Sequence, residues 1–279
     1  MAQGTIADYE VIVVDSSPIG GALDSSSLGG AGAAATDGAT QVIRPERALP
    51  PQEARNRGAE SARGETLVFT DADCGPRHDW LERLLEAHAE GAPLVGGSID
   101  PDGGRLVERG ADICKFAPWL EGLPPGTRAT LPTANLSLTR ATWEQIGPFR
   151  LLAWSGDTEF CIRARRTGIP LRFEPRAVVR HDDPVKLRRF LHERRERGHA
   201  YARLRMEAAD WSRSRAAIYT ALSPLIGVFL SARGLVTAIR SGRPLSAIAT
   251  SPISAGGFVA WTLGEAGAYA RHAMRGARA

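Results

Sequence analysis

Cysteine and lysine are scarce in this chain. Its 279 residues include three cysteines, Cys74, Cys114 and Cys161, which are odd in number and widely spaced. This pattern excludes a disulfide framework and fits no zinc motif, so a reducing compartment is favoured. Lysine occurs only at Lys115 and Lys186, so the formal net charge of +4 comes almost entirely from arginine.

An N-terminal secretory signal is also lacking. The first residues, MAQGTIADYE, contain neither a basic start nor an apolar core. Hydrophobic residues make up 43% of the chain, which is too many for a disordered protein and enough for one main core with an appendage. Arginines become dense between Lys186 and Arg215, and this asymmetry indicates an anionic neighbour for the second half.

Apolar segments alternate with helical segments in the first two thirds of the chain. Strands are expected at residues 9–15, 40–45, 66–73 and 93–99, with a Gly/Ser/Ala-rich loop or weak helix at 16–38. Helices are expected at 52–62, which stops before Gly64, and at 78–91, which has an apolar face and stops at Gly91. This alternation predicts an α/β fold with a mostly parallel, Rossmann-type sheet flanked by helices.

A second group of patterns follows in the middle of the chain. Residues 131–149 combine a polar strand with a helix that ends at Gly147. A further helix follows Asp157 and Glu159, and two short strands then lead to His181. An acid at a helix N-terminus is commonly only a favourable partner for the helix dipole, so Asp157 alone indicates no chemistry.

Two acids, Asp71 and Asp73, stand one residue apart in the stretch LVFTDADCGP, where an apolar strand ends. Ligands bind at the carboxyl ends of strands in open α/β sheets, and a pair of carboxylates suits a hard divalent cation. In the alternative interpretation, the two acids cap the helix that begins near His78. The residues alone leave both interpretations open.

Three segments taken together are more specific. Residues 54–81, 133–149 and 156–182 closely resemble, in order and spacing, glycosyltransferase family 2, whose members have the GT-A fold and use nucleotide-sugar donors. The resemblance runs from about residue 9 to residue 181. The shared positions are Asn56, Gly58, Ala62, Gly64, Asp71, Asp73, Pro76, Trp80, Asn135, Arg140, Gly147, Phe149, Asp157, Arg163, Gly168, Pro175 and His181.

The resemblance implies a metal site for the donor. Asp73 would hold a Mg²⁺ or Mn²⁺ on the donor's diphosphate, with Asp71 nearer the ribose. His181 would complete the metal shell or contact the diphosphate, although a histidine hydrogen-bonded at a strand end is the alternative. A divalent cation at this place would stabilise the charge of the leaving group.

The resemblance also implies a catalytic base and further substrate contacts. Asp157 would take the proton of the acceptor hydroxyl in an inverting transfer, while Glu159 would face solvent or cap the first helical turn. Substrate contacts are further expected at Asp15, Asn56, Asn135 and Arg140.

The chain departs from the family pattern in two places. The strand and helix that open the family's domain are not expected here, because only eight residues precede Tyr9. Either the true start lies upstream or the donor site is incomplete. In the segment SGDTEF, Gly156 stands where the family commonly has an acid before the base, which removes a charge that would raise the pKa of Asp157.

The last third contains two segments without charge, residues 216–232 and 244–264. Their lengths are near the ~20 residues that span a bilayer, but Pro224 and Pro252 interrupt them. Arg233, Arg240 and Arg243 lie between them and oppose transfer of this loop across a membrane. An interfacial or re-entrant hairpin, two true spans and a soluble helical pair all remain open, and the arginines favour anionic lipid headgroups.

These patterns predict a GT-A-like glycosyltransferase domain at residues 1–185 and a basic, membrane-associating helical region at 186–279. The enzyme is expected at the cytoplasmic face of the cell membrane, where it would move a sugar from a nucleotide-sugar donor to a glycan or lipid-linked acceptor. The alternative is a catalytically inactive GT-A-like binding module. Nucleic acid is an unlikely partner, because the arginine-rich stretch has few aromatic residues for base stacking.

Overall fold

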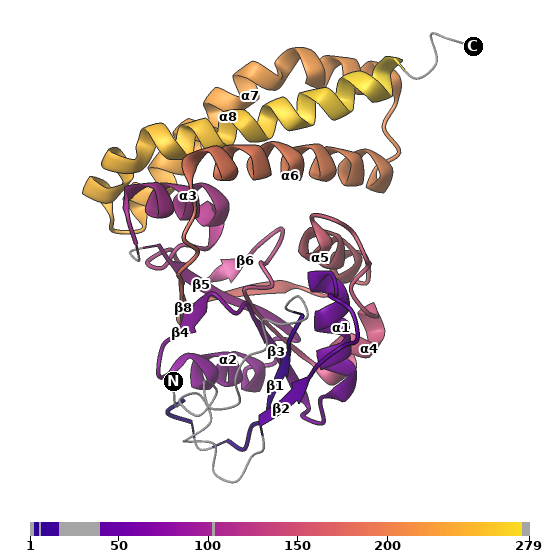
Figure 1. The fold of residues 1–279 in the computed structure, drawn as a ribbon, viewed down its shortest axis with the longest axis vertical. Helices are drawn as coiled ribbons and strands as arrows, with labels where there is room; N and C mark the ends of the chain where they lie inside the picture. Colours follow the sequence, from indigo (N-terminus) through magenta and orange to yellow (C-terminus); the bar gives the residue numbers. More distant parts are fainter. Residues whose placement is uncertain (1–2, 6, 17–39, 102–103, 275–279) are drawn as a thin grey trace. The chain divides into compact units, whose positions relative to one another are not determined.

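The computed structural model describes residues 3–5, 7–16, 40–101 and 104–274 (Figure 1). The loop or weak helix predicted at 16–38 therefore lies almost wholly outside the described residues. The chain forms two compact parts. The sheet part comprises Met1–Ile99 and Pro124–Arg180, and the helical part comprises Asp100–Leu123 and His181–Ala279. The sequence predicted a boundary at residue 185 and did not assign residues 100–123 to the second part.

Two β-sheets are described in the sheet part. Strands β1 (Val11–Val14) and β2 (Thr40–Ile43) form a parallel pair. The larger sheet has the strand order β3-β7-β5-β8-β4, and β6 pairs with β8. Its strands are β3 (Thr66–Thr70), β4 (Cys74–Pro76), β5 (Leu94–Asp100), β6 (Gly126–Thr127), β7 (Asn135–Thr139) and β8 (Leu171–His181).

Strand β7 makes the larger sheet mixed rather than mostly parallel. It lies between β3 and β5 and runs antiparallel to both. The predicted unit of strand, helix and strand is present as β3, α2 and β5. Strand β7 lies between β3 and β5, and the order of elements along the sequence does not reveal this. The α/β fold with flanking helices is confirmed.

The described helices of the sheet part are α1 (Pro51–Ser61), α2 (Trp80–Ala89), α4 (Arg140–Ile146) and α5 (Gly156–Arg166). Helices α4 and α5 pack through aromatic side chains. Phe149 is the centre of one cluster, with its ring centroid 5.4 Å from that of Phe69, 5.6 Å from that of Trp143 and 4.5 Å from that of Phe160. These contacts fix α4 and α5 against strand β3, next to which the two acids of the DAD motif lie.

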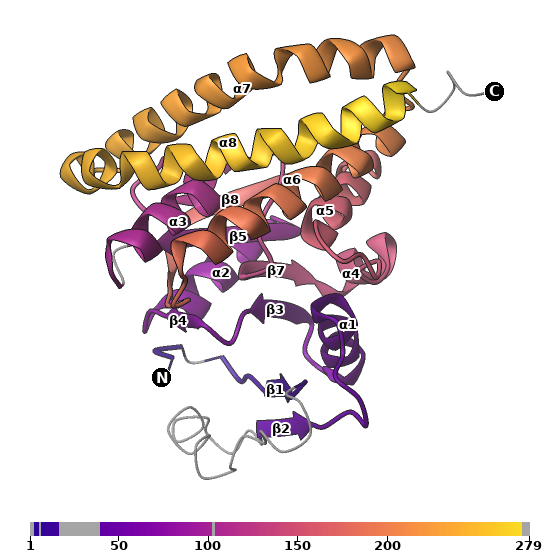
Figure 2. The same cartoon turned by 45° about the horizontal axis from the view of Figure 1, so that its top comes forward.

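The helical part contains α3 (Leu106–Phe116), the short 3-10 helix η2 (Ala117–Trp119), α6 (Leu187–Ala208), α7 (Arg213–Arg240) and α8 (Pro244–Met274). Helix α8 lies between α7 and α6, as both views show, and it also packs against α3 (Figures 1 and 2). Among the described residues, α7 is the one helix that is long and apolar enough to cross a membrane by length and composition.

Candidate active site

The acids Asp71 and Asp73 lie in a tight turn between β3 and β4. Leu67 and Phe69 of β3 are buried, and the backbone N–H of Cys74 donates to the carbonyl of Asp71 at 3.0 Å. Helix α2 begins only at Trp80, with Asp79 as its N-cap. The alternative interpretation, in which Asp71 and Asp73 cap this helix, is therefore wrong.

Asp71 forms an ion pair with a residue that the sequence did not single out. The guanidinium of Arg55, on α1, lies 2.5 Å from Asp71 Oδ1. Both side chains are partly exposed, with 19% and 35% of their surface accessible. Arg55 therefore orients Asp71. Its position directly before Asn56, in the ARNRG segment, is the feature by which the sequence could have identified it.

The neighbouring thiol does not compete for a hard cation. Cys74 Sγ lies 3.8 Å from Asp73 Oδ1. Burial, and then the negative charges of Asp71 and Asp73, raise the pKa of the Cys74 thiol far above its ordinary value. The thiol therefore stays protonated at neutral pH, and the turn offers carboxylate oxygens as ligands.

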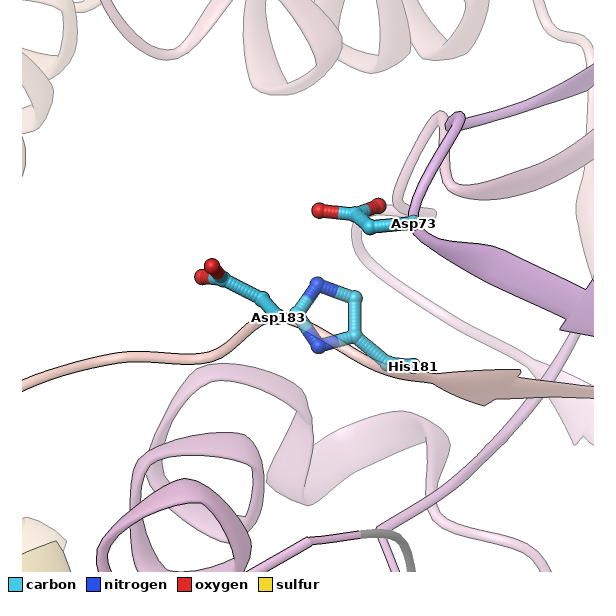
Figure 3. Close-up of side chains that lie close together, drawn as sticks. All are labelled: Asp73, His181 and Asp183. Atoms are coloured by element: carbon cyan, nitrogen blue, oxygen red, sulfur yellow. The ribbon is translucent and has the colours of Figure 1, made fainter.

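The sheet brings the turn at Asp73 to the end of β8. Strand β4 starts directly after Asp73 and pairs with β8, whose last residue is His181. Asp73, His181 and Asp183 each offer a ligand atom, and these atoms lie within 4.8 Å of one another (Figure 3). The sequence predicted Asp73 and His181 as metal ligands but missed Asp183, although the HDD run after the strand was a visible signal.

His181 is held by residues of α3. Its Nδ1 lies 3.0 Å from Oδ1 of Asp112, and its ring centroid lies 5.1 Å from that of Phe116. Only 7% of His181 is exposed. Burial raises the pKa of the Asp112 carboxyl, and the hydrogen bond and charge of His181 oppose that rise. A histidine whose Nδ1 faces a carboxylate commonly offers Nε2 as its ligand atom.

Lys115 places a positive charge beside the same group. Its Nζ lies 3.1 Å from Oδ2 of Asp183 and 3.8 Å from Oδ1 of Asp112. Burial alone would raise the pKa of Asp183, but the charge and hydrogen bond of Lys115 outweigh it and lower that pKa. Asp183 is therefore ionised at neutral pH. The carboxylates of Asp73 and Asp183 and the imidazole of His181 form a donor set that fits Mg²⁺ or Mn²⁺.

Asp157 lies in the first turn of α5, which begins at Gly156 and not after the acid as predicted. Its Oδ1 accepts a hydrogen bond from the backbone N–H of Thr158 at 2.7 Å. Ser155, just before the helix, has a φ of 64°, a conformation that non-glycine residues seldom adopt. A Cβ on Gly156 would lie 2.7 Å from the side chain of Gln52, so a larger residue there would require Gln52 to shift.

Glu159 differs from its prediction. It was expected to face solvent or cap the helix, but only 4% of the residue is exposed. Its carboxylate lies 2.9 Å from Arg163 Nε and 3.4 Å from Arg150 Nε. Arg163 also donates to the backbone carbonyls of Ile146, Gly147 and Pro148. Glu159 therefore holds the arginine that caps α4, and its function is structural.

Two of the residues predicted to contact substrate, Asn135 and Arg140, make hydrogen bonds within the fold, and their substrate contacts stay predictions. Asn135 is fully buried, accepts from Trp80 Nε1 at 2.9 Å, and donates to the carbonyls of Ser98 and Ala177. Its hydrogen bonds are used within the sheet. Arg140 donates to the carbonyls of Ala62 and Gly64, which follow α1.

The other two predicted contacts are Asn56, inside α1, and Asp15, just after β1. Asn56 exchanges two hydrogen bonds of 2.8 Å with the backbone of Phe149 and so ties α1 to the loop after α4. The carboxylate of Asp15 lies 3.9 Å from Arg44 Nε. Substrate contacts at Asp15 and Asn56 stay predictions.

Comparisons with known proteins find glycosyltransferases. Residues 1–130 match the model of Glycosyl transferase family 2. Glycosyltransferase AglE of Haloferax volcanii is 32% identical over 170 residues, which cover 59% of this chain and 54% of that protein. The pre-mycofactocin glycosyltransferase of Mycobacterium tuberculosis is 28% identical over 162 residues, which cover 54% of this chain and 34% of that protein. The chain thus spans about half the length, or less, of these relatives.

Solved structures show the same fold. The mannosyltransferase PcManGT of Pyrobaculum calidifontis, in complex with GDP-Man and Mn²⁺, has a TM-score of 0.53 at 17% identity and covers 87% of this chain and 76% of that one. GalNAc-T7 with UDP, GalNAc and Mn²⁺ has a TM-score of 0.50 at 18% identity, covering 63% of this chain and 38% of that one. Residues 1–130 of this chain thus match Glycosyl transferase family 2, and the chain has the GT-A fold of these structures.

Proposed function

We propose that the protein transfers a sugar from a nucleotide-sugar donor to an acceptor hydroxyl with inversion, assisted by a divalent cation. The observation that carries the proposal is the group of Asp73, His181 and Asp183 at the paired ends of β4 and β8. Both solved neighbours were crystallised with Mn²⁺ and a uridine or guanosine diphosphate compound. This supports a nucleoside diphosphate sugar as the donor class.

Four residues would have distinct functions in this reaction. Asp73, His181 and Asp183 would hold the cation, which when bound would offset the charge that develops on the departing diphosphate. Asp157 would accept the proton of the acceptor hydroxyl while that oxygen forms its bond to the sugar and the bond to the diphosphate breaks. Asp157 is partly exposed at the start of α5, so a substrate can reach it.

We further infer that the acceptor is lipid-linked or belongs to the cell envelope, and that the protein attaches to the cytoplasmic face of the membrane. The support is the exposure of large apolar side chains on both long C-terminal helices. On α8, Leu245 is 83% exposed, and Ile248 and Leu263 are each 59% exposed. Exposed apolar surface of this extent marks an interaction site.

The test is a screen of the full chain against nucleotide sugars, with release of nucleoside diphosphate as the readout. We expect one donor to be turned over in the presence of Mn²⁺ or Mg²⁺ and the release to stop with EDTA. Asp73→Asn should abolish the release, whereas Asp79→Asn, which removes a neighbouring acid paired with Arg83, should not. Metal-dependent nucleotide binding without turnover of any donor would instead favour the inactive binding module.

A further inference from the structure

Helix α7 has an inverted distribution of side-chain sizes. Its buried residues are small: Ala216, Ser223, Gly227, Gly234 and Ala238. Its exposed face carries large apolar residues, Ile218, Leu222, Leu225, Val228, Phe229 and Val236, which we call the α7 stripe. Leu225 and Val228 are each 68% exposed. A helix of a soluble protein buries its large apolar residues, whereas helices in lipid pack through small ones.

Arginines border the α7 stripe on one side. Arg215 and Arg233 are 18 residues apart, which is five turns of a helix with ~3.6 residues per turn, so they lie on the same flank. Arg240 follows Arg233 by seven residues, which is about two turns. Arg215, Arg233 and Arg240 are all exposed, and α7 contains no acid. An apolar face bordered by guanidinium groups matches the boundary between acyl chains and anionic phosphate headgroups.

Helix α8 cannot separate from the charged helix α6. A Cβ on Gly198 of α6 would lie 2.2 Å from the carbonyl oxygen of Trp261, and one on Gly264 of α8 would lie 2.0 Å from that of Arg195. The two backbones are therefore in direct contact. Arg194 of α6 also stacks on the ring of Trp261 at 4.3 Å. The exposed residues of α6 include Arg188, Arg189, Arg195, Glu196 and Arg203. If α8 crossed a bilayer, these charges would enter the hydrocarbon with it, which is strongly unfavourable.

The turn between α7 and α8 is tied to the rest of the helical part. Arg243 lies 2.8 Å from Glu121 Oε2 and 3.3 Å from Asp100 Oδ1. A Cβ on Gly122 would lie 2.4 Å from the carbonyl oxygen of Ser241, so the backbone of the loop that contains Gly122 also contacts the turn. The other end of the hairpin continues from α6. Both ends of α7 are thus joined to segments of the same part that carry charged side chains.

We propose that the α7–α8 hairpin lies within one leaflet of an anionic membrane and does not span it. The α7 stripe contacts the boundary of headgroups and acyl chains, and α6 stays on the aqueous side. The occupant of the stripe is a lipid surface that displays phosphate groups. This inference rests on the membrane attachment proposed above and specifies its mode.

The first experiment is flotation of the full chain with vesicles of phosphatidylcholine containing 30% phosphatidylglycerol. Wild-type protein should float with them, and the double variant Leu225→Asp/Phe229→Asp should lose at least nine tenths of that binding. Leu187→Asp is the matched control, since it places the same charge on an exposed apolar residue of α6, and it should float like wild type. Equal flotation of wild type and the double variant overturns the proposal. It is also overturned if wild-type protein does not bind vesicles and instead forms a dimer that the double variant disrupts.

The second experiment separates a leaflet-bound hairpin from a spanning one. In a Cys74→Ser background, Ala209→Cys and Arg240→Cys mark the two ends of α7, and a membrane-impermeant maleimide is applied to inside-out and right-side-out membrane vesicles. The proposal predicts that both positions react from the same side. Reaction from opposite sides overturns it while leaving membrane attachment intact, and absence of the protein from the membrane pellet overturns the attachment itself.

Discussion

At the scale of single residues, the site depends on how His181 is oriented. Asp112 lies 3.0 Å from its Nδ1 and comes from α3, a helix that the sequence patterns did not indicate. Partners that orient a ligating histidine typically contribute ~10–100-fold to metal affinity. Asp112 is thus a positioning residue that acts through His181.

Asp112→Asn should therefore weaken Mn²⁺ binding by about 10–100-fold. The asparagine can keep a hydrogen bond to the ring but loses the charge that favours one tautomer. Titration of Mn²⁺, followed by the loss of its free electron-paramagnetic-resonance signal, measures the affinity, with Asp79→Asn as the control. An unchanged Mn²⁺ affinity in Asp112→Asn would show that the contact only stabilises the fold.

Asp157 and Glu159 are two acids in one helical turn with different expected functions. Loss of a general base slows a reaction ~10²–10⁴-fold, and we expect Asp157→Asn to reduce turnover by that factor while nucleotide binding persists. Glu144→Gln, at an exposed acid of α4, is the control. Wild-type turnover of Asp157→Asn would remove this residue from the mechanism.

Glu159→Gln should instead reduce stability. The carboxylate is buried between Arg150 and Arg163, and loss of a charged partner in such a place costs about 1–3 kcal/mol. Thermal unfolding by circular dichroism should show a lower midpoint, with nearly normal turnover below it. A variant as stable as wild type but inactive would mean that the base had been assigned to the wrong acid.

At the scale of elements, strands and helices with strong local patterns were predictable. The apolar run before Asp71 and the stop at Gly91 correspond to β3 and to the end of α2. The order of strands in the sheet was not predictable. Strand β7 lies between β3 and β5, and nothing in its sequence indicates that position. The burial of Glu159 also escaped prediction, since it depends on Arg150 and Arg163 packing over the start of α5.

The packing of α8 against α6 can be tested at two glycines of α8. Gly264→Ala should lower stability by about 1–3 kcal/mol, because its Cβ would meet the backbone of Arg195. Gly267→Ala is the matched control: the nearest atoms to its Cβ are 3.9 Å away on the flexible guanidinium of Arg271. It should be neutral or stabilising by up to ~1 kcal/mol. Calorimetric midpoints measure both, and equal effects of the two substitutions would mean that the helices are not in close contact.

At the scale of the whole molecule, strand β8 connects the residues proposed for sugar transfer to the helices proposed for membrane attachment. Strand β8 ends in His181, a proposed metal ligand, and the chain then continues into α6, the helix against which α8 packs. The family resemblance implied the metal site, and local patterns indicated the apolar segments. The sequence left spanning and interfacial attachment open. Our preference for interfacial attachment depends on the contacts of Gly198 with Trp261 and of Gly264 with Arg195, which join segments far apart in the sequence.

Membrane binding should depend on ionic strength but not vanish in salt. Arginines near anionic headgroups act over roughly 8 Å at physiological ionic strength, and salt screens them, whereas burial of the α7 stripe is insensitive to screening. Vesicle flotation should therefore decrease between 0.05 and about 1 M NaCl and remain measurable at the upper limit. Complete loss at high salt would mean that charge alone holds the protein to the membrane.

We propose that Asp73 binds a cation on the nucleotide, and calorimetric titration of UDP and GDP into the full chain, with and without Mn²⁺, tests this directly. For wild type and Asp79→Asn, we expect at least a tenfold higher affinity for one nucleotide when Mn²⁺ is present. For Asp73→Asn, we expect a normal fold and no response to Mn²⁺. A folded Asp73→Asn variant with an unchanged Mn²⁺-dependent affinity would show that Asp73 does not bind the cation.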